Sequence, residues 1–402
     1  MSIRIVRGNI VDAECDAVVN AANEHLMRGS GVCGAIFASA DAERLEAACD
    51  AIGYTPAGNA AVTPSFGLEA EYIIHAVGPV WKGGYEGEYD ILRRCYINAL
   101  EAAGNCGVSS VAFPLISAGV FGFPIEAAWE TALFACRNSS LDICFMVLDD
   151  KILDTGLRIL RNMNTGIVCF DNDNGLFECF SNWYRAPFKY AGRQYSSIET
   201  YMMIQKVEMF GEYELAEKIE KADDASEAKR IGRTQMERFD AALWEEAGYN
   251  IVKRGVRAKF EQYPEYAEIL KQTEGMEIAE CNADDRIWGI GIGLDDDRRY
   301  DRKSWAGTNR LGRILMEVRE ELKSGLSYVD IDDLPFDRIW DIRPSDLEGR
   351  YADAAATYRI TLDYEQKYVF DTSRFGDMQN LPKAGFREML QEICDIWRQE
   401  CI

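Results

Sequence analysis

The sequence predicts an α/β domain at the N-terminus, followed by a helix-rich α+β domain and a small C-terminal α+β unit. Residues 1–150 alternate apolar, β-branched runs with amphipathic stretches, a pattern that favours a sheet largely buried between helices. Residues 197–272 show dense helical periodicity instead. With 402 residues and 48% hydrophobic composition, the chain can bury several cores. Its length corresponds to roughly two to three domains.

The first domain is expected to contain six strands and four helices. Each strand is a short run rich in Val, Ile or Ala, and each helix carries apolar residues at helical spacing. A boundary is expected near residue 165, where the last helix ends in the turn-forming residues 162–166. The expected strands are 3–6, 17–19, 60–63, 72–77, 111–115 and 143–148, and the expected helices are 35–51, 91–103, 125–135 and 150–161.

The remaining chain divides at Gly325. Before it, residues 208–229 suggest one exposed amphipathic helix with mixed charges, and a further helix opens at 305–312 and runs to Arg319. After it, residues 358–364 and 367–370 suggest a hairpin, and residues 386–398 a terminal helix. The predicted domains are therefore 1–165, 166–325 and 326–402.

Composition excludes several classes of protein. The chain has 44 Lys+Arg against 67 Asp+Glu, so a formal charge of -23 repels phosphate backbones and argues against general DNA coating. No apolar run reaches the roughly 18 residues of a membrane span, and the first residues lack the pattern of a signal peptide, so we expect a cytoplasmic protein.

Cysteine and histidine usage points away from a metal centre. The twelve cysteines include no C-x-x-C pair and are expected to be small buried hydrophobes. With only His25 and His75, a histidine-rich zinc site is hard to build, so we expect no metal and no cofactor. Catalysis is expected to depend on carboxylates, backbone amides and bound water.

Two loops of small residues, each after a strand and before a helix, suggest a phosphate cleft. They lie within 19–36 and 114–124, and a third stretch, 8–11, follows the first strand. Glycine lets backbone amides approach a pyrophosphate, and a helix N-terminus adds a favourable dipole. Either loop alone could be an ordinary tight turn, whereas together they could bind one diphosphate from both sides.

These stretches, in this order, resemble the macrodomain family, which binds ADP-ribose on a mixed sheet between helices. The motifs are Asn20-Ala21-Ala22-Asn23, the Gly31-to-Ile36 turn, Ile74-to-Pro79 and Ser117-to-Gly122. The resemblance implies that Asn9 meets the adenine amino group, and that Asn23 and Phe121 lie near the distal ribose. The implied ADP-ribose-binding residues are Asn9, Ile10, Asn20, Asn23, Gly31, Val32, Cys33, Ser117, Ala118, Gly119, Val120 and Phe121.

One departure from that family leaves the activity of the first domain open. Hydrolytic members often carry Asp where this chain has Cys33, and a carboxylate there would orient a water or a substrate group. The domain could therefore be a reader of ADP-ribose or a hydrolase that uses a substrate-held water. His75 falls within an expected strand and is interpreted as a core histidine.

The second domain combines carboxylates with tryptophans. Glu199 and Lys206 are seven residues apart and share one face of an expected helix. A buried carboxylate beside flat aromatic faces suits N-glycoside cleavage, because it can stabilise an oxocarbenium-like centre or activate water. The alternative is that Glu199 only pairs with Lys206 and that the tryptophans are core.

The motif order over 168–323 resembles the NADAR family of N-glycosidases, which has an α-rich α+β fold. Matching segments are 181–184, 199–206, 285–291 and 305–312, although Thr200 stands where members often show His. The resemblance implies Glu199, Asp285 and Lys206 as catalytic residues. The implied substrate-binding residues are Ser181, Asn182, Trp183, Tyr201, Gln205, Trp288, Gly289 and Asn309.

Both resemblances concern ADP-ribose. The leading hypothesis is an antitoxin-like glycohydrolase that removes ADP-ribose from guanine in nucleic acid, with ADP-ribose and ADP-ribosylated nucleic acid or protein as partners. One alternative is a metabolic N-glycosidase acting on riboflavin-pathway or NAD-derived intermediates, and another is a non-catalytic ADP-ribose reader. We also expect three basic clusters, 229–233, 253–259 and 298–303, to form a phosphate-attracting mouth if the fold gathers them around Glu199 and Asp285.

Overall fold

The computed structural model describes residues 2–172, 175–190, 192–236, 239–324, 360–362 and 368–370. The chain forms two compact units. One comprises residues 1–179 and 275–308, and the other comprises 180–274 and the chain from 309 onward. Among the residues that the structure describes, no helix combines the length and apolarity that a bilayer span needs.

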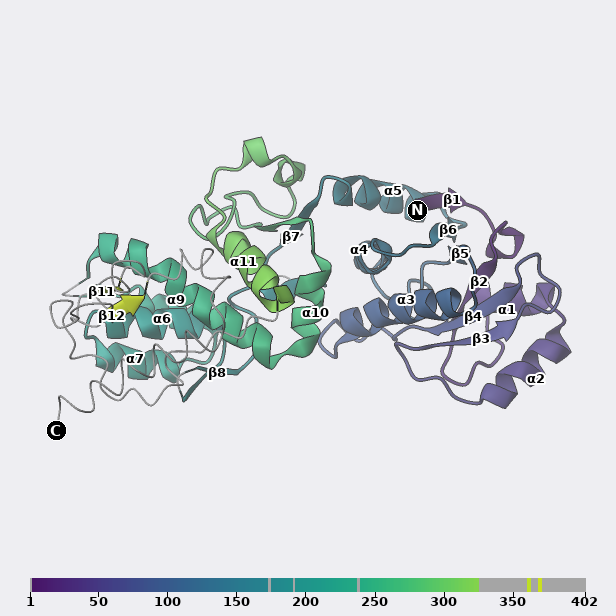
Figure 1. The fold of residues 1–402 in the computed structure, drawn as a ribbon, viewed down its shortest axis with the longest axis horizontal. Helices are drawn as coiled ribbons and strands as arrows, with labels where there is room; N and C mark the ends of the chain where they lie inside the picture. Colours follow the sequence, from purple (N-terminus) through teal and green to yellow (C-terminus); the bar gives the residue numbers. More distant parts are fainter. Residues whose placement is uncertain are drawn as a thin grey trace, which may run out of the picture. The chain divides into compact units, whose positions relative to one another are not determined.

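The first unit is built on a six-stranded mixed sheet (Figure 1). Its strand order is β1-β6-β5-β2-β4-β3, and all neighbours are parallel except β3, which runs antiparallel to β4 at the edge. The predicted α/β class is confirmed. The strands are β1 Ile3–Arg7, β2 Ala17–Ala22, β3 Ala60–Pro64, β4 Tyr72–Val77, β5 Ser110–Phe113 and β6 Asp142–Val147.

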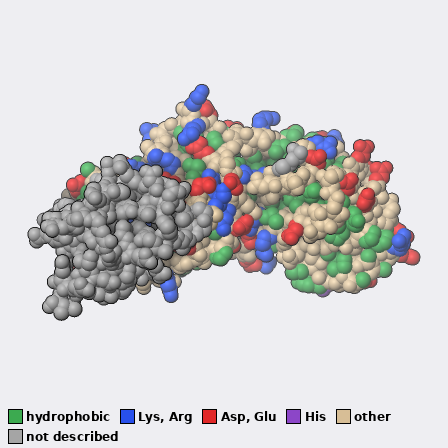
Figure 2. Space-filling model, in the orientation of Figure 1, with side chains coloured by type: hydrophobic (Ala, Val, Ile, Leu, Met, Phe, Trp, Pro, Cys, Tyr) green, Lys and Arg blue, Asp and Glu red, His purple; other side chains and the backbone are tan. Residues whose placement is uncertain are grey.

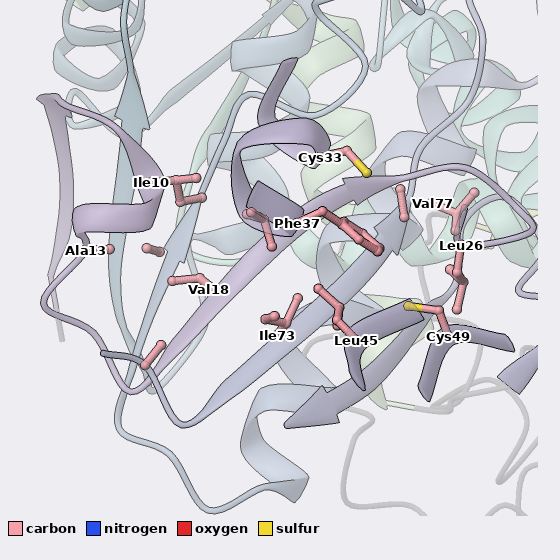
Figure 3. Packing of buried hydrophobic residues seen from close by; sticks show 14 residues of the cluster. Ile10, Ala13, Val18, Leu26, Cys33, Phe37, Leu45, Cys49, Ile73 and Val77 are labelled. Carbon is pink, nitrogen blue, oxygen red and sulfur yellow. The ribbon is translucent and has the colours of Figure 1, made fainter. Parts of the chain in front are cut away.

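Five helices cover this sheet. Helices α1 and α2 contact each other, α3 contacts α4, and α4 contacts α5. A core cluster that includes Val18, Phe37, Leu45 and Ile73 joins the first two helices to the sheet (Figure 3). The helices are α1 Gly31–Ser39, α2 Ala42–Ile52, α3 Glu88–Asn105, α4 Ile125–Cys136 and α5 Asp150–Met163.

The prediction of a single helix over 35–51 is wrong, because the chain breaks between α1 and α2. The Asp41 side chain accepts the Arg44 amide and so caps α2, and short polar side chains at that position start a helix. The glycine-rich turn before it is also shorter than predicted, since β2 continues to Ala22 and places Asn20 in the sheet.

A second, parallel strand pair completes the first unit. Strand β7 Ile167–Phe170 pairs with β10 Glu277–Glu280, although about a hundred residues separate them in the sequence. The segment 281–308 that follows β10 contains the short 3-10 helices η3 Asp297–Tyr300 and η4 Arg302–Ser304. Parallel pairing therefore brings this segment into the first unit.

The second unit is rich in helices, as predicted. A hairpin of β8 Phe188–Tyr190 and β9 Arg193–Tyr195 precedes them. The predicted single helix over 208–229 is wrong, because Gly211 takes a positive φ and Asp224 caps a new helix. The helices are α6 Ile198–Met209, α7 Tyr213–Glu220, α8 Ala225–Gly232, α9 Ala241–Gln262, α10 Pro264–Gln272 and α11 Arg310–Ser324.

Little of the C-terminal segment is described. Strand β11 Ile360–Leu362 pairs antiparallel with β12 Tyr368–Phe370, so the strands of the predicted hairpin are confirmed. The predicted terminal helix over 386–398 lies outside the described residues.

Candidate functional sites

Asn20 is the most deeply buried polar residue of the predicted ADP-ribose cleft. It lies on β2 opposite His75 on β4 and is fully buried. Its Nδ2 is 3.2 Å from His75 Nδ1 and 3.7 Å from Cys33 Sγ, while its Oδ1 has no hydrogen-bond partner among the described residues. A buried acceptor left without a donor costs about 1–3 kcal/mol. A hydrogen-bond donor of a ligand would remove this cost by binding Asn20 Oδ1.

His75 is a core residue, as predicted. Its Nε2 is 3.0 Å from Thr63 Oγ1, and burial lowers the pKa of His75 to about 4. A neutral imidazole is therefore the stable form at neutral pH. In that form one ring nitrogen donates and the other accepts, so His75 links β3 to β2 through Thr63 and Asn20 rather than acting as a charged group.

Ser117 has a strained backbone within the loop after β5. Its φ is 63°, in the left-handed region that non-glycine residues rarely adopt, and it is 6% exposed. Its Oγ has no hydrogen-bond partner among the described residues. Strain and an unpaired buried hydroxyl at one residue are typical of functional sites. The loop is held by Phe123 N, which donates to Ser117 O, and by Trp81 N, which donates to Phe121 O.

The first turn of α1 carries Gly31, Val32 and Cys33, three of the predicted ligand residues. Ser30 is the N-cap but makes no side-chain cap bond, so backbone amides are available there, as they are at anion-binding helix N-termini. Cys33 is buried, and its Sγ accepts the Gly29 amide at 3.3 Å. Cys33 therefore closes the turn that leads into the helix.

Three predicted contacts have other functions in the structure. Asn9 Oδ1 accepts the Val11 amide and caps a short 3-10 helix, η1 Ile10–Asp12, and the Ile10 side chain lies in the core (Figure 3). Because the Ile10 side chain is buried, any ligand contact from Ile10 would come from its backbone. Asn23 Oδ1 accepts the amides of His25 and Met27, so its side chain closes its own turn. Of the remaining loop residues, Val120 is 89% exposed and Ala118, Gly119 and Phe121 are exposed or half-buried.

Glu199 lies in the first turn of α6 and is 2% exposed. Its amide donates to Asn182 O at 2.8 Å, which ties the helix start to the segment 181–183. The Ser197 side chain caps the helix by accepting the Thr200 amide. The positive end of the helix dipole favours a negative charge at this position. The helix start that carries this buried side chain is thus fixed by hydrogen bonds of its backbone amides.

Lys206 lies near the last turn of the same helix and interacts electrostatically with Glu199. Its Nζ donates to Gly232 O at 3.1 Å and lies 4.8 Å from the ring centroid of Phe239 and 5.8 Å from that of Trp244. Burial, and then the nearby Arg233, lower the pKa of Lys206, whereas Glu199 raises it. Both residues lie on α6, the helix that the sequence predicted for them.

Tyr201, one of the predicted substrate-binding residues, is packed among aromatic rings. It is fully buried and packs edge-on against Phe188, Tyr190 and Tyr195, so it belongs to the core. Gln205 hydrogen-bonds to the Tyr195 side chain. The two residues therefore connect α6 to the β8-β9 hairpin rather than line an open surface.

The segment 181–183 joins Glu199 to a buried lysine that the sequence prediction missed. Lys259 is fully buried on α9, and its Nζ donates to Ser181 O at 3.2 Å. Ser181 Oγ accepts the Trp183 amide at 3.0 Å, and Asn182 is 4% exposed with its Oδ1 unpartnered among the described residues. Lys259 precedes Phe260 in the sequence, but nothing in the local sequence indicates that the lysine is buried.

Asp285, in the first unit, holds a tight turn. Its Oδ1 accepts the amides of Ile287 at 2.9 Å and Trp288 at 2.8 Å. A Cβ on Gly289 would be 2.9 Å from Glu280 O, and one on Gly307 would be 2.3 Å from Gly289 O, so both glycines are required by close backbone approach. Asp285 thereby sets the position of Trp288, which is half-buried.

Asn309 is the last of the predicted residues and precedes α11. It is 3% exposed, and its φ of 52° is left-handed. Asn tolerates that region better than most residues but still does so at a cost. Glu199, Lys206, the segment 181–183 and Asn309 belong to the second unit, whereas Asp285, Trp288 and Gly289 belong to the first.

Comparison with known proteins finds a family match for two segments of the chain. Residues 19–132 match the family model described as Macro domain, and residues 169–323 match the one described as NADAR domain. A macro domain-containing protein of Listeria monocytogenes is 41% identical over 177 residues, which cover 43% of this chain and 93% of that protein. An O-acetyl-ADP-ribose deacetylase of Citrobacter rodentium is 41% identical over 37% of this chain and 89% of its own length.

Solved structures match the same part of the chain. A macrodomain of Oceanobacillus iheyensis with ADP is 32% identical, with a TM-score of 0.38, over 40% of this chain and 90% of its own. The curated relatives and the two family models agree with the order of motifs in the sequence. The chain belongs to the macro domain-containing proteins and carries a NADAR domain after its macro domain.

Proposed function

We propose that the protein is an ADP-ribosyl glycohydrolase that removes ADP-ribose from guanine in nucleic acid, in an antitoxin-like role. Water would replace the guanine nitrogen at the anomeric carbon of the ADP-ribosyl ribose, which releases ADP-ribose and restores the base. The observation that carries this proposal is the buried Glu199 carboxylate at the start of α6, held through Asn182 and close enough to Lys206 for electrostatic coupling.

The residues divide into roles according to their surroundings. In this proposal Glu199 stabilises the oxocarbenium-like centre or activates the water, because its charge is buried and preorganised. Trp183 offers a flat face to a base or a ribose. The resemblance to the NADAR family implies Asp285 as a second catalytic carboxylate, and one of its oxygens is already used to hold the Trp288 turn. Asn182 contributes a buried amide to the same substrate.

The first unit would bind ADP-ribose. Unpaired buried oxygens on Asn20 and Ser117, together with open amides at the start of α1, support this assignment. Hydrolysis of O-acetyl-ADP-ribose by this unit is a second candidate activity, favoured by the identity to a relative named as that deacetylase. Release of acetate from O-acetyl-ADP-ribose by the full chain would test it, and no release would leave binding alone.

The test uses an oligonucleotide ADP-ribosylated on guanine. Wild-type protein should release ADP-ribose, and Glu199→Gln should reduce the rate by about a hundredfold or more, since the substitution removes the charge and keeps the shape. Glu208→Gln on the same helix is the matched control, because Glu208 is half-buried and pairs with Arg193. Equal rates for wild type and Glu199→Gln, or no release by either, would defeat the proposal.

A further inference from the structure

The three predicted basic clusters differ in how their charges are balanced. In the cluster 253–259, Lys253 pairs with Glu317 and Glu321, and Arg257 pairs with Glu261. In the cluster 298–303, Arg298 pairs with Asp296, and Arg302 pairs with Glu277. Two cations in each of these clusters are therefore paired with neighbouring carboxylates.

The third cluster lies at the end of α8. Arg230 pairs with Glu227, but within the described residues neither Lys229 nor Arg233 lies within ion-pair distance of a carboxylate. A chain with 67 acidic and 44 basic residues offers carboxylates in excess. Two neighbouring cations with no carboxylate in ion-pair distance, over the part of the chain that the structure describes, are therefore informative.

These cations lie beside the residues assigned to catalysis. Lys229 Nζ is 5.2 Å from the centroid of the Trp183 ring. Lys206 Nζ donates to the carbonyl of Gly232, the residue before Arg233. A Cβ on Gly232 would be 2.4 Å from Met203 Sδ, so the end of α8 packs tightly on α6. Close packing holds the cations of the two helices near one another.

The electrostatics of Lys206 indicate a second cation nearby. After burial, Arg233 is the next cause that lowers the pKa of Lys206, which places two like charges near each other. An anion bound between them would relieve that repulsion. Arg presents a planar fork that matches phosphate oxygens, and Lys provides a point charge for the same group.

We propose that Lys206, Lys229 and Arg233 form a phosphate-binding site beside Trp183, which takes phosphate groups of the ADP-ribosylated substrate. The inference rests on the proposed glycohydrolase function and adds the residues that recognise the phosphate groups of its substrate. A base or ribose would lie on Trp183, and a phosphate would lie next to Lys229. The simpler alternative is that these cations only stabilise α8, by interacting with the negative end of its dipole. Arg230, on the same turn, serves as the control for that alternative.

The kinetic test compares Lys229→Gln and Arg233→Gln with Arg230→Gln in the full-length protein. The substrates are ADP-ribosyl-guanosine, which carries only the diphosphate, and the modified oligonucleotide, which adds backbone phosphates. Lys229→Gln and Arg233→Gln should each raise KM about tenfold with kcat within about twofold of wild type, because a phosphate contact binds ground and transition states alike. Arg230→Gln should leave both constants unchanged.

The two substrates identify the source of the phosphate. Equal increases in KM for both would assign the site to the diphosphate, and an increase for the oligonucleotide alone would assign it to the nucleic-acid backbone. Unchanged KM for both, or an equal increase with Arg230→Gln, would overturn the proposal.

A second measurement does not depend on activity. Acetylation of lysines by an amine-reactive ester, read by mass spectrometry, should be several-fold slower at Lys229 when inorganic pyrophosphate is present. Lys221, which is exposed at the end of α7, should be unaffected. Protection of Lys229 by pyrophosphate in a protein that cleaves no modified guanine would reject the proposed function and keep the phosphate site. Absence of protection at Lys229, or equal protection at Lys221, would reject the site.

Discussion

Ser117 combines a left-handed backbone conformation with a side chain that packs closely against Gly78. Its Oγ lies where a neighbouring side chain would otherwise stand, since a Cβ on Gly78 would be 2.2 Å from that oxygen and 2.6 Å from Ile116 Cγ2. Gly78 follows β4, and Ser117 follows β5, so the two strand ends depend on each other. A glycine about forty residues away in the sequence therefore leaves the space that the Ser117 hydroxyl occupies.

Gly78→Ala should destabilise the first unit and weaken ADP-ribose binding. The added methyl must displace Ser117 or Ile116, and overpacking of this kind costs about 1–3 kcal/mol of unfolding free energy. Urea unfolding would measure the loss. Gly104→Ala is the matched control, because Gly104 is within α3 with open space around its Cα, and this change should stabilise by about 0.5–1 kcal/mol. Equal stability of the two variants would contradict the packing argument.

At the scale of elements, helix starts and tight turns position the chemistry. The start of α6 holds Glu199, the start of α1 offers backbone amides, and the turn after β10 holds Trp288 through Asp285. In each case a short polar side chain or a glycine defines the geometry, and the functional group follows from it. Asp285 is the case in which positioning and charge can be separated.

Asp285→Asn should keep the turn and lose the charge, because an amide oxygen can still accept the two amides that Asp285 Oδ1 accepts. Asp285→Ala should lose both and cost about 1 kcal/mol of stability, as the loss of a helix cap does. If the charge assists cleavage, both variants lose activity on modified guanine, but only Asp285→Ala lowers the midpoint of thermal unfolding. Full activity in Asp285→Asn would show that Asp285 only positions Trp288.

At the scale of the whole molecule, a net charge of -23 is combined with a local cationic site. Figure 2 shows acidic and basic side chains interspersed over the described surface in view, rather than one continuous basic face. Long-range repulsion is screened within about 10 Å at 0.1 M salt, so short-range contacts to one modified nucleotide can still dominate. Recognition through ADP-ribose therefore suits this chain better than recognition of the nucleic-acid backbone.

The two proposed activities should be separable, since they are assigned to different parts of the chain with their own buried residues. Glu199→Gln should abolish release of ADP-ribose from guanine, while ADP-ribose still protects the amides of residues 28–36 and 116–123 from hydrogen exchange. Gly78→Ala should reduce that protection and keep kcat/KM for modified guanine within about twofold. Loss of both activities in either variant would show that the two sites are coupled.

The sequence by itself determined the fold class, the helical richness of the second unit and the place of His75 in the core. These features follow from local hydrophobic periodicity and from motif order, which neighbouring residues encode. The break between α1 and α2 and the division of 208–229 into α7 and α8 depend on caps at Asp41 and Asp224 that periodicity does not reveal.

Only the tertiary structure decided which side chains that are far apart in the sequence contact one another. It buried Lys259 under Ser181, paired several of the predicted basic residues with carboxylates, and placed Lys229 beside Trp183 without such a partner among the described residues. It also turned Tyr201 into a core residue. Burial and ion pairing depend on contacts between residues far apart in the sequence, so no local pattern could have predicted them.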